Sequence, residues 1–354
     1  MRCDLSELSL HADGSTLSAI LTDFLTLSQS DAAIIRRLGK FAITGKASGS
    51  HEAAVAKLWI ECAQGTAKID ATARKVGKAY DIKGNFMTPR FRVGKLIDNS
   101  LLGDVSATTS LSMRVGPGIL DGEIDLNAPL LQLKGYDYKN ITARVSKRAN
   151  LVAGNVSILD SNVDLDIVGE ADIASVIPHA DIQGNVRTLR LSPLGLAADY
   201  ADVRVSGAFD ISIAGNNLDN LNGYADFSDI RFSNNRYHDV YLDHVHLDSD
   251  HSELPYSLNL TSDIVNASVV GDFNFASLPA SIKELASYFL PTLVGHVAPT
   301  RPQNYQWNVK VFHTSPLLDM LKLPVTLLED LEISGACNTA AGTASILMDV
   351  PYLQ

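Results

Sequence analysis

Apolar and polar residues alternate along most of the chain, and the stretch "NVSILDSNVDLDIVG" at 155–169 shows this pattern clearly. Two alternating runs flank the turn-forming residues "LDSN". Alternation with a period of two predicts β-strands with one apolar and one polar face, and the parity of the turn keeps both apolar faces on one side of the hairpin. The apolar residues of this predicted hairpin are Val156, Ile158, Val163, Leu165 and Ile167.

The same pattern recurs further along the chain, which indicates an internal repeat. The stretch "LDGEIDLNAPLL" beginning at Leu120 matches "LNGYADFSDIRF" beginning at Leu221, an offset of 101 that also places Gly122 on Gly223. At an offset of 102, "NVSILDSNVDLDIVG" matches "SLNLTSDIVNASVVG". We therefore expect residues 120–173 and 221–275 to be two copies of one unit of several strands. The apolar positions of the second hairpin include Leu258, Leu260, Val265 and Val269.

Helical periodicity is confined to short stretches between the alternating runs. Apolar residues at helical spacing predict a helix from Ile282 to Leu290, and Ser315 before Pro316 predicts the start of another over 315–323. A short helical turn is expected near 94–102, and the region 15–38 is ambiguous, although its apolar residues have helical spacing. These interruptions predict an N-terminal β/helical segment at 1–93, a first β-repeat unit at 94–188, a second at 189–290, and the start of a further unit with a short helix at 291–354.

About twenty short strands joined by short turns favour antiparallel pairing between neighbours in the chain. The two tryptophans, Trp59 and Trp307, supply no regular aromatic anchor of the kind that a β-sandwich core contains. We therefore expect an all-β fold with a few short helices, in which an elongated, curved antiparallel sheet forms a taco-like apolar groove built from repeats of about 100 residues. Tandem β-sandwiches are the alternative. An open groove of this kind exposes more apolar surface than soluble proteins usually leave uncovered, so it requires a lid, a partner or an apolar ligand.

Charge and cysteine content narrow the class of protein. The net charge of −11 argues against nucleic acid as a partner, because nucleic-acid binding requires clusters of Lys and Arg. The scattered Cys3, Cys62 and Cys337 predict unpaired thiols rather than a disulfide framework or a metal knuckle. No apolar run reaches the roughly 18 residues that a membrane span needs. The start of the chain lacks the apolar segment of a signal peptide, and we expect an excised part of a longer protein.

Several motifs together resemble a known family. They are the glycine-containing hairpins, the helix openings "LRLSPLGL" and "HTSPLLDML", and the stretches "FRVGKLIDNSLLGDVSATTSL" and "YADFSDIRFSNNRYHDVYLDHVHLDSD". Over nearly its whole length the chain looks like the AsmA/TamB superfamily, and most like the TamB-like envelope proteins of Bacteroidota. The resemblance implies a periplasmic β-groove segment of a protein that is anchored in the inner membrane by a helix absent from this chain. It also implies a part in phospholipid transport between the inner and outer membranes and in outer-membrane biogenesis, with an outer-membrane barrel assembly protein as a possible partner.

The densest polar cluster is "RYHDVYLDHVHLDSDH". His244 and His246 lie two residues apart and share one strand face, with Asp248 and Asp250 beyond them, so that a divalent-metal site is conceivable. The repeat favours another interpretation, because a shared switch of parity places His244 and His246 on the polar outer face, beside the positions of Asn140 and Thr142. Asp164 and Asp166 alternate with the apolar face in the same way and are interpreted as solubilising charge. No catalytic constellation, phosphate loop or nucleotide fingerprint is present, so we expect neither an enzyme nor a cofactor.

Two functional hypotheses follow from these patterns. The first is a non-enzymatic groove that binds phospholipid acyl chains along its apolar floor by desolvation. The second is a structural periplasmic scaffold that assists outer-membrane protein assembly without binding lipid. The residues expected to line the groove are Val156, Ile158, Val163, Leu165, Ile167, Leu258, Leu260, Val265 and Val269.

Overall fold

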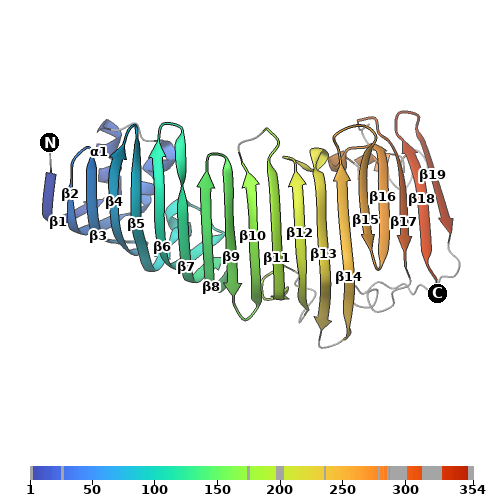
Figure 1. Cartoon of the computed structure of the whole chain (residues 1–354), viewed down its shortest axis with the longest axis horizontal. Helices are drawn as coiled ribbons and strands as arrows, with labels where there is room; N and C mark the ends of the chain where they lie inside the picture. The colour runs from blue at the N-terminus through green and yellow to red at the C-terminus, as the bar shows by residue number, and fades with distance from the viewer. Residues whose placement is uncertain are drawn as a thin grey trace. The chain divides into compact units, whose positions relative to one another are not determined.

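The computed structural model is an all-β protein with a few short helices (Figure 1). It describes residues 3–24, 28–173, 176–196, 203–234, 237–277, 301–312 and 329–349, together with 280, 281, 283, 284 and 287. Within these ranges 19 strands belong to one curved, unclosed antiparallel sheet, in which each strand pairs with its neighbours in the chain. The predicted fold class is therefore confirmed, and the alternative of tandem sandwiches is wrong for the described strands.

The chain divides into two compact units at Val168 and Gly169, and strand β10 (Val163–Asp172) crosses this division. The four segments predicted from the sequence stay a prediction. The elements of the first unit are β1 (Cys3–Asp13), α1 (Gly14–Phe24), α2 (Gln29–Arg37), β2 (Lys40–Gly49), β3 (Ala53–Cys62), β4 (Gly65–Val76), β5 (Ala79–Arg92), α3 (Val93–Ile97), β6 (Leu102–Gly116), β7 (Ile119–Leu133), β8 (Tyr136–Arg148) and β9 (Leu151–Leu159).

The second unit continues with strands and two short 3₁₀ turns. Its elements after β10 are β11 (His179–Arg190), β12 (Arg204–Ala214), η1 (Leu218–Asn220), β13 (Asn222–Asn234), β14 (Tyr237–Asp250), β15 (Tyr256–Ser262), β16 (Val265–Asp272), η2 (Phe275–Ser277), β17 (Asn304–Val311), β18 (Leu331–Asn338) and β19 (Thr343–Asp349).

The two copies of the sequence repeat form the same four-strand arrangement. Strands β7 to β10 occupy the first copy and β13 to β16 the second, each as consecutive antiparallel strands. As predicted, the alternation of inward and outward side chains shifts by one residue in β8 of the first copy and in β14 of the second. In β8 the adjacent Lys139 and Asn140 are both exposed before buried Ile141, and in β14 the adjacent Asp243 and His244 are both exposed after buried Leu242. Asn140 has a φ of 51°, and this left-handed conformation lets successive side chains in β8 change sides.

Cross-strand register keeps apolar residues opposite apolar residues in the first unit. One continuous row across β3 to β9 consists of Leu58, Ile69, Phe86, Thr109, Leu126, Ala143 and Val156. The row one residue further along the strands lies on the opposite face and is polar: Lys57, Asp70, Asn85, Ser110, Asp125, Arg144 and Asn155. Because side chains alternate between the faces of a strand, this register separates an apolar face from a polar face.

The second unit is built in the same way. Its apolar row across β12 to β18 consists of Ile211, Ala225, Leu247, Leu260, Ala267, Val309 and Ile333. The neighbouring row on the other face consists of Ser212, Tyr224, Asp248, Asn259, Ser268, Asn308 and Ser334.

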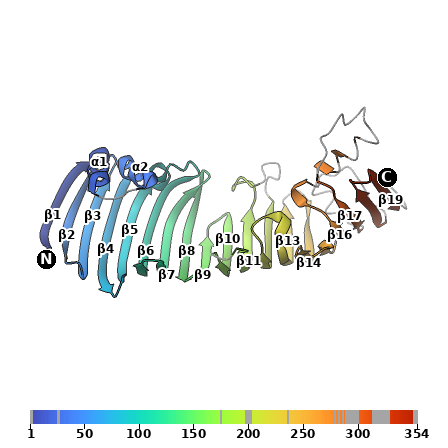
Figure 2. The same ribbon diagram turned by 90° about the horizontal axis from the view of Figure 1, so that it is seen from above.

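Helices α1 and α2 lie at one end of the strands of the first unit (Figure 2). They pack on each other, and the buried Ser18 hydroxyl donates to the Ala32 carbonyl oxygen at 3.3 Å. Ser28 caps α2 by accepting from the Asp31 N–H, which resolves the ambiguous region 15–38 as two helices. The turn expected near 94–102 is the shorter α3, and its C-cap residue, Asp98, is in the left-handed conformation. The helix predicted from Ile282 to Leu290 lies largely, and the one predicted over 315–323 wholly, outside the described residues.

The glycines that match between the repeats are placed where no other residue fits. Gly122 and Gly223 have φ values of 158° and 128°. A Cβ on Gly122 would lie 2.4 Å from the Ser112 carbonyl oxygen, and a Cβ on Gly223 would lie 2.0 Å from the Ser212 carbonyl oxygen. The backbone of each strand therefore approaches its neighbour at a point where only glycine avoids both the clash and the strain.

We expect Gly223→Ala to destabilise the second unit by roughly 1–3 kcal/mol, because it places a Cβ against backbone in a conformation that L side chains rarely adopt. The matched control is Gly342→Ala, which changes a turn glycine that also has a positive φ, 62°, but has open space around it. Urea unfolding followed by circular dichroism measures both. Equal destabilisation by the two substitutions would contradict a specific steric role for Gly223.

Candidate functional site

The apolar face of the first unit is covered only in part. Of all the described residues, sixteen apolar ones are buried, and the apolar rows consist mainly of half-buried side chains. Buried Ala107, Ala128 and Ile141 form a small cluster against which Val156 and Ile158 pack. These contacts are lateral, between strands of the same sheet. No second sheet lies over this face within the described part, so each side chain has neighbours beside it but few above it.

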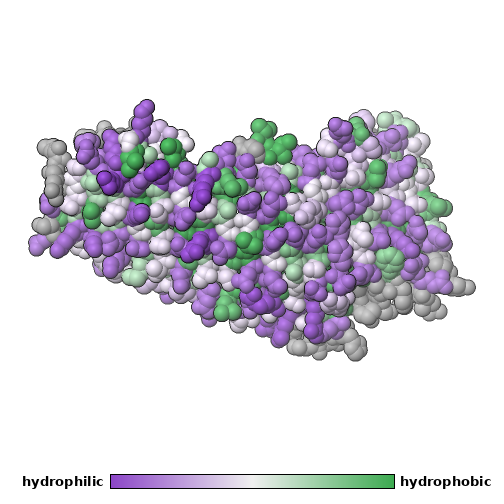
Figure 3. All heavy atoms as spheres, in the orientation of Figure 1, coloured by the Kyte–Doolittle hydropathy of each residue, from purple (hydrophilic) through white to green (hydrophobic). Residues whose placement is uncertain are grey.

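The face opposite the apolar rows is polar. Figure 3 shows one face of the molecule, on which hydrophilic residues predominate. The polar side of the first unit carries ion pairs between neighbouring strands, such as Lys57–Asp70 at 3.1 Å and Arg114–Asp81 at 2.7 Å. These exposed pairs contribute mainly solubility and register.

The structure places the predicted lining residues on the apolar side of each unit. Val163 is only 2% exposed and stands where β10 begins, while Leu165 and Ile167 follow it on the same side and are half-buried. In the second unit, Leu258 and Val269 pair directly and pack against the buried cluster described next. Val265 pairs with Val311, and Leu260 pairs with Ala267. Asp164 and Asp166 occupy the alternating positions of β10, as the pattern predicted.

An aromatic cluster fills one end of the apolar face in the second unit. Phe273, Tyr305 and Cys337 are buried, and Trp307 is among the half-buried residues that pack against them. The Cys337 and Cys62 thiols are free, as predicted, and the Cys3 side chain lies outside the described residues. Burial raises the pKa of the Cys337 thiol, and burial, together with a hydrogen bond to Cys337, raises the pKa of Tyr305 to about 12. Both groups therefore remain protonated at neutral pH.

His251 is the titratable base of this end cluster. Its ring stacks on Tyr256 with centroids 4.8 Å apart and meets Phe273 edge-on at 5.0 Å. The Nδ1 atom lies 3.2 Å from the Ser249 hydroxyl, and the buried Nε2 has no hydrogen-bond partner among the described residues. Desolvation by this burial lowers the pKa of His251. The neutral imidazole is therefore the form that the folded unit holds.

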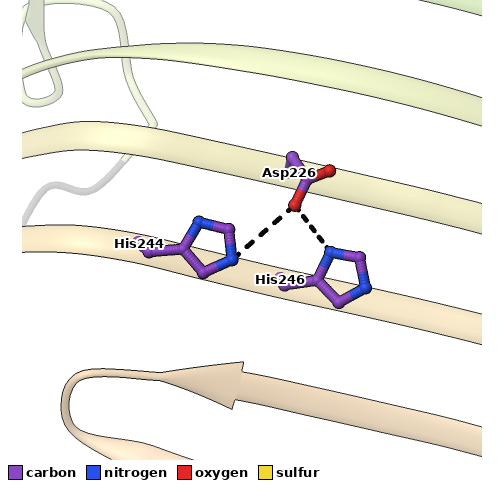
Figure 4. A group of neighbouring side chains, drawn as sticks. All are labelled: Asp226, His244 and His246. Carbon is purple, nitrogen blue, oxygen red and sulfur yellow. Dashed lines mark hydrogen bonds and ion pairs between the residues drawn. The ribbon is translucent and has the colours of Figure 1, made fainter.

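The histidine cluster lies on the polar side, as predicted, but with a partner that the sequence pattern did not reveal. Asp226 on β13 stands opposite His246 on β14, and its Oδ1 lies 2.6 Å from His246 Nδ1 and 3.8 Å from His244 Nε2 (Figure 4). Asp250, which the sequence pattern grouped with the histidines, instead accepts hydrogen bonds from Ser252. The repeat contains a signal for this partner, because Asp226 matches Asp125 of the first copy at an offset of 101.

Comparison with known proteins gives no family assignment. No family model, no curated protein and no solved structure matches the chain. None of the helices in the described ranges is both long enough and apolar enough to span a membrane.

We expect the second unit to lose stability as the pH falls below about 6.5, the ordinary pKa of histidine, because the unfolded chain then binds a proton that folded His251 resists. The contribution of His251 is fully present above that pH. His251→Phe keeps an aromatic ring in the cluster and should flatten this part of the pH profile of the unfolding midpoint. His179→Phe is the control, since His179 is exposed on β11. An unchanged profile in His251→Phe would refute the assignment.

Proposed function

We propose that the chain is a non-enzymatic, lipid-binding groove segment. The observation that carries the proposal is the continuous row of half-buried apolar side chains in each unit, opposite a polar row and without a second sheet over it in the described part. Such a face gains free energy when an apolar ligand displaces water from it. An acyl chain has a matching shape, because it is narrow, flexible and apolar along its whole length.

The energetics suit a conduit better than a single fixed site. Each buried methylene contributes about 0.8 kcal/mol, and this gain has no preferred direction along the strands. The rows consist mostly of Ala, Val, Leu and Ile, which present a smooth surface with few polar atoms. An acyl chain can therefore move along the floor without breaking specific bonds, while its head group stays in water at the rim.

The setting that we propose for this activity follows the resemblance to TamB-like envelope proteins. In that setting the segment lies in the periplasm of a longer protein that is anchored to the inner membrane, and it takes part in phospholipid transport between the two membranes and in outer-membrane biogenesis. The net charge of −11 agrees with lipid contact through the apolar face rather than through a basic surface patch.

One observation favours the scaffold as the second candidate. Strand β19 is an edge of the second unit and pairs only with β18 among the described strands. Its Ile346, Leu347 and Met348 are 70%, 72% and 57% exposed. An exposed apolar edge of this kind accepts an additional strand from another chain or from elsewhere in the same protein. A scaffold of this type predicts protein partners at β19 and no lipid on the apolar face.

Charged substitutions on the apolar face should abolish lipid binding while the fold is retained. We expect Leu165→Glu and Val265→Glu each to lower the amount of bound phospholipid several-fold, because a carboxylate on the floor keeps water there and opposes burial of the acyl chain. The matched controls are Val168→Glu and Val270→Glu, which place the same charge on the opposite side of the same strands, where these valines are 54% and 41% exposed. Native mass spectrometry of protein purified from a Gram-negative host measures the bound lipid.

Circular dichroism of all four variants tests whether the sheet is retained. The proposal fails if the wild-type protein carries no lipid, or if the inner and outer substitutions have equal effects in folded protein.

Photo-crosslinking separates the groove from the scaffold. A benzophenone side chain at Leu260 should capture phospholipid, whereas the same group at Val270, on the other side of the hairpin formed by β15 and β16, should not. Crosslinks to protein at Leu347 with no lipid captured at Leu260 would favour the scaffold and overturn the lipid-binding proposal.

A further inference from the structure

Three side chains with metal-binding atoms meet on the polar side of the second unit. Asp226 comes from β13, and His244 and His246 come from the next strand, β14 (Figure 4). Their candidate ligand atoms all lie within 4.8 Å of one another. The two imidazole rings are nearly parallel, with centroids 6.0 Å apart and an angle of 12° between their planes. The side chains converge because His244 and His246 share one strand face and Asp226 stands directly opposite His246.

The first copy of the repeat has an ordinary salt bridge at the position that corresponds to Asp226 and His246. In the first unit, Asp125 pairs across the strands with Arg144 and forms a salt bridge with it. In the second unit, the matching positions are Asp226 and His246. An arginine cannot bind a metal ion, whereas a neutral imidazole can. The cross-strand register, which differs here from the alignment of the sequences, matches Thr142 with His244, because Thr142 pairs with Asn127 and His244 with Ser228. The second copy therefore contains two imidazoles where the first contains none.

The surroundings of the cluster are acidic. Asp210 is the other cross-strand partner of Asp226, and Asp248 Oδ1 lies 3.5 Å from His246 Nε2. The carboxylate of Asp263 accepts a hydrogen bond from the His244 backbone N–H at 3.3 Å. Among the described strands, the cross-strand partners of Asp226, His244 and His246 include no Lys or Arg. The carboxylates around the cluster therefore attract a cation.

We propose that Asp226, His244 and His246 bind one divalent transition-metal ion of the zinc type. Zinc is bound by imidazole nitrogen and carboxylate oxygen at about 2.0–2.2 Å, which requires the ligand atoms to move to within about 3.5 Å of one another. His244 is exposed, whereas Asp226 and His246 are half-buried, so in the proposed site the His244 side chain turns toward Asp226. Asp248 orients the His246 ring by accepting a hydrogen bond from its remaining ring N–H. Water occupies the remaining positions of the ion.

The donor set also predicts the selectivity of the site. Two imidazoles and one carboxylate favour Zn²⁺ and Cu²⁺ over Mg²⁺ and Ca²⁺, which prefer sets of oxygen ligands. The bound ion links β13 to β14 on the polar side, so it adds a cross-strand connection in the second unit. This site is independent of the proposed lipid-binding face, because the three side chains point to the opposite side of the sheet from Val245 and Leu247.

Isothermal titration of the full chain with Zn²⁺ tests the proposal, using protein without a polyhistidine tag that has been treated with a chelator. We expect saturable binding of one ion per chain. His244→Ala and His246→Ala should each weaken binding at least about tenfold, and the double variant should abolish it. His179→Ala is the matched control, because His179 also lies 2.8 Å from a carboxylate, that of Asp181, but belongs to no cluster of three such ligands among the described residues.

A spectroscopic measurement locates the ion. Long-range ¹⁵N NMR of the imidazole nitrogens should show zinc-dependent shifts at His244 and His246 and none at His179. The absence of saturable Zn²⁺ binding, or binding that survives the double substitution in protein whose circular dichroism is unchanged, would overturn the proposal. So would equal competition by Mg²⁺ or Ca²⁺.

Discussion

The structure depends on one constraint, which is the antiparallel register between neighbouring strands. Side chains alternate between the faces of a strand, so a slip of one residue would move every apolar side chain to the polar side. Paired rows such as Leu58–Ile69–Phe86 in the first unit and Leu247–Leu260–Ala267 in the second show that the register holds across many strands. No second sheet is present among the described residues, so cross-strand pairing keeps the apolar and polar faces of the strands apart.

Local backbone features preserve this register along the strands. Gly122 and Gly223 allow close approach to the preceding strand, and the change of side in β8 and β14 restores the match between apolar residues of neighbouring strands. The apolar face gains most of its burial from side-by-side contact, which leaves its upper surface available to a ligand. This property is the physical basis of the proposed lipid-binding function. The face is closed by aromatic packing only near one end of the second unit, around Phe273 and Tyr305.

The two repeat copies use their polar faces differently. The first contains cross-strand ion pairs such as Arg144–Asp125. The charged guanidinium of Arg144 has no nitrogen lone pair that could bind a metal ion. The second replaces this arginine with His246 and adds His244 beside it, and the carboxylates of Asp226 and Asp248 lie close to the His246 ring. The shared apolar face and the distinct polar faces show that one strand arrangement can hold a common apolar surface and a local site that differs between copies.

The sequence by itself determined the strands, the repeat and the side on which Val156 to Ile167 and Leu258 to Val269 lie, because these follow from local periodicity and turn parity. It also predicted the free thiols of Cys62 and Cys337. Only the tertiary structure decided that the described strands form one sheet instead of sandwiches, because that choice depends on whether strands far apart in the chain pack face to face. It also resolved 15–38 as α1 and α2 through their mutual packing. The contact of Asp226 with His244 and His246 likewise depends on the cross-strand register of β13 and β14. This register cannot be read from any single stretch of the sequence.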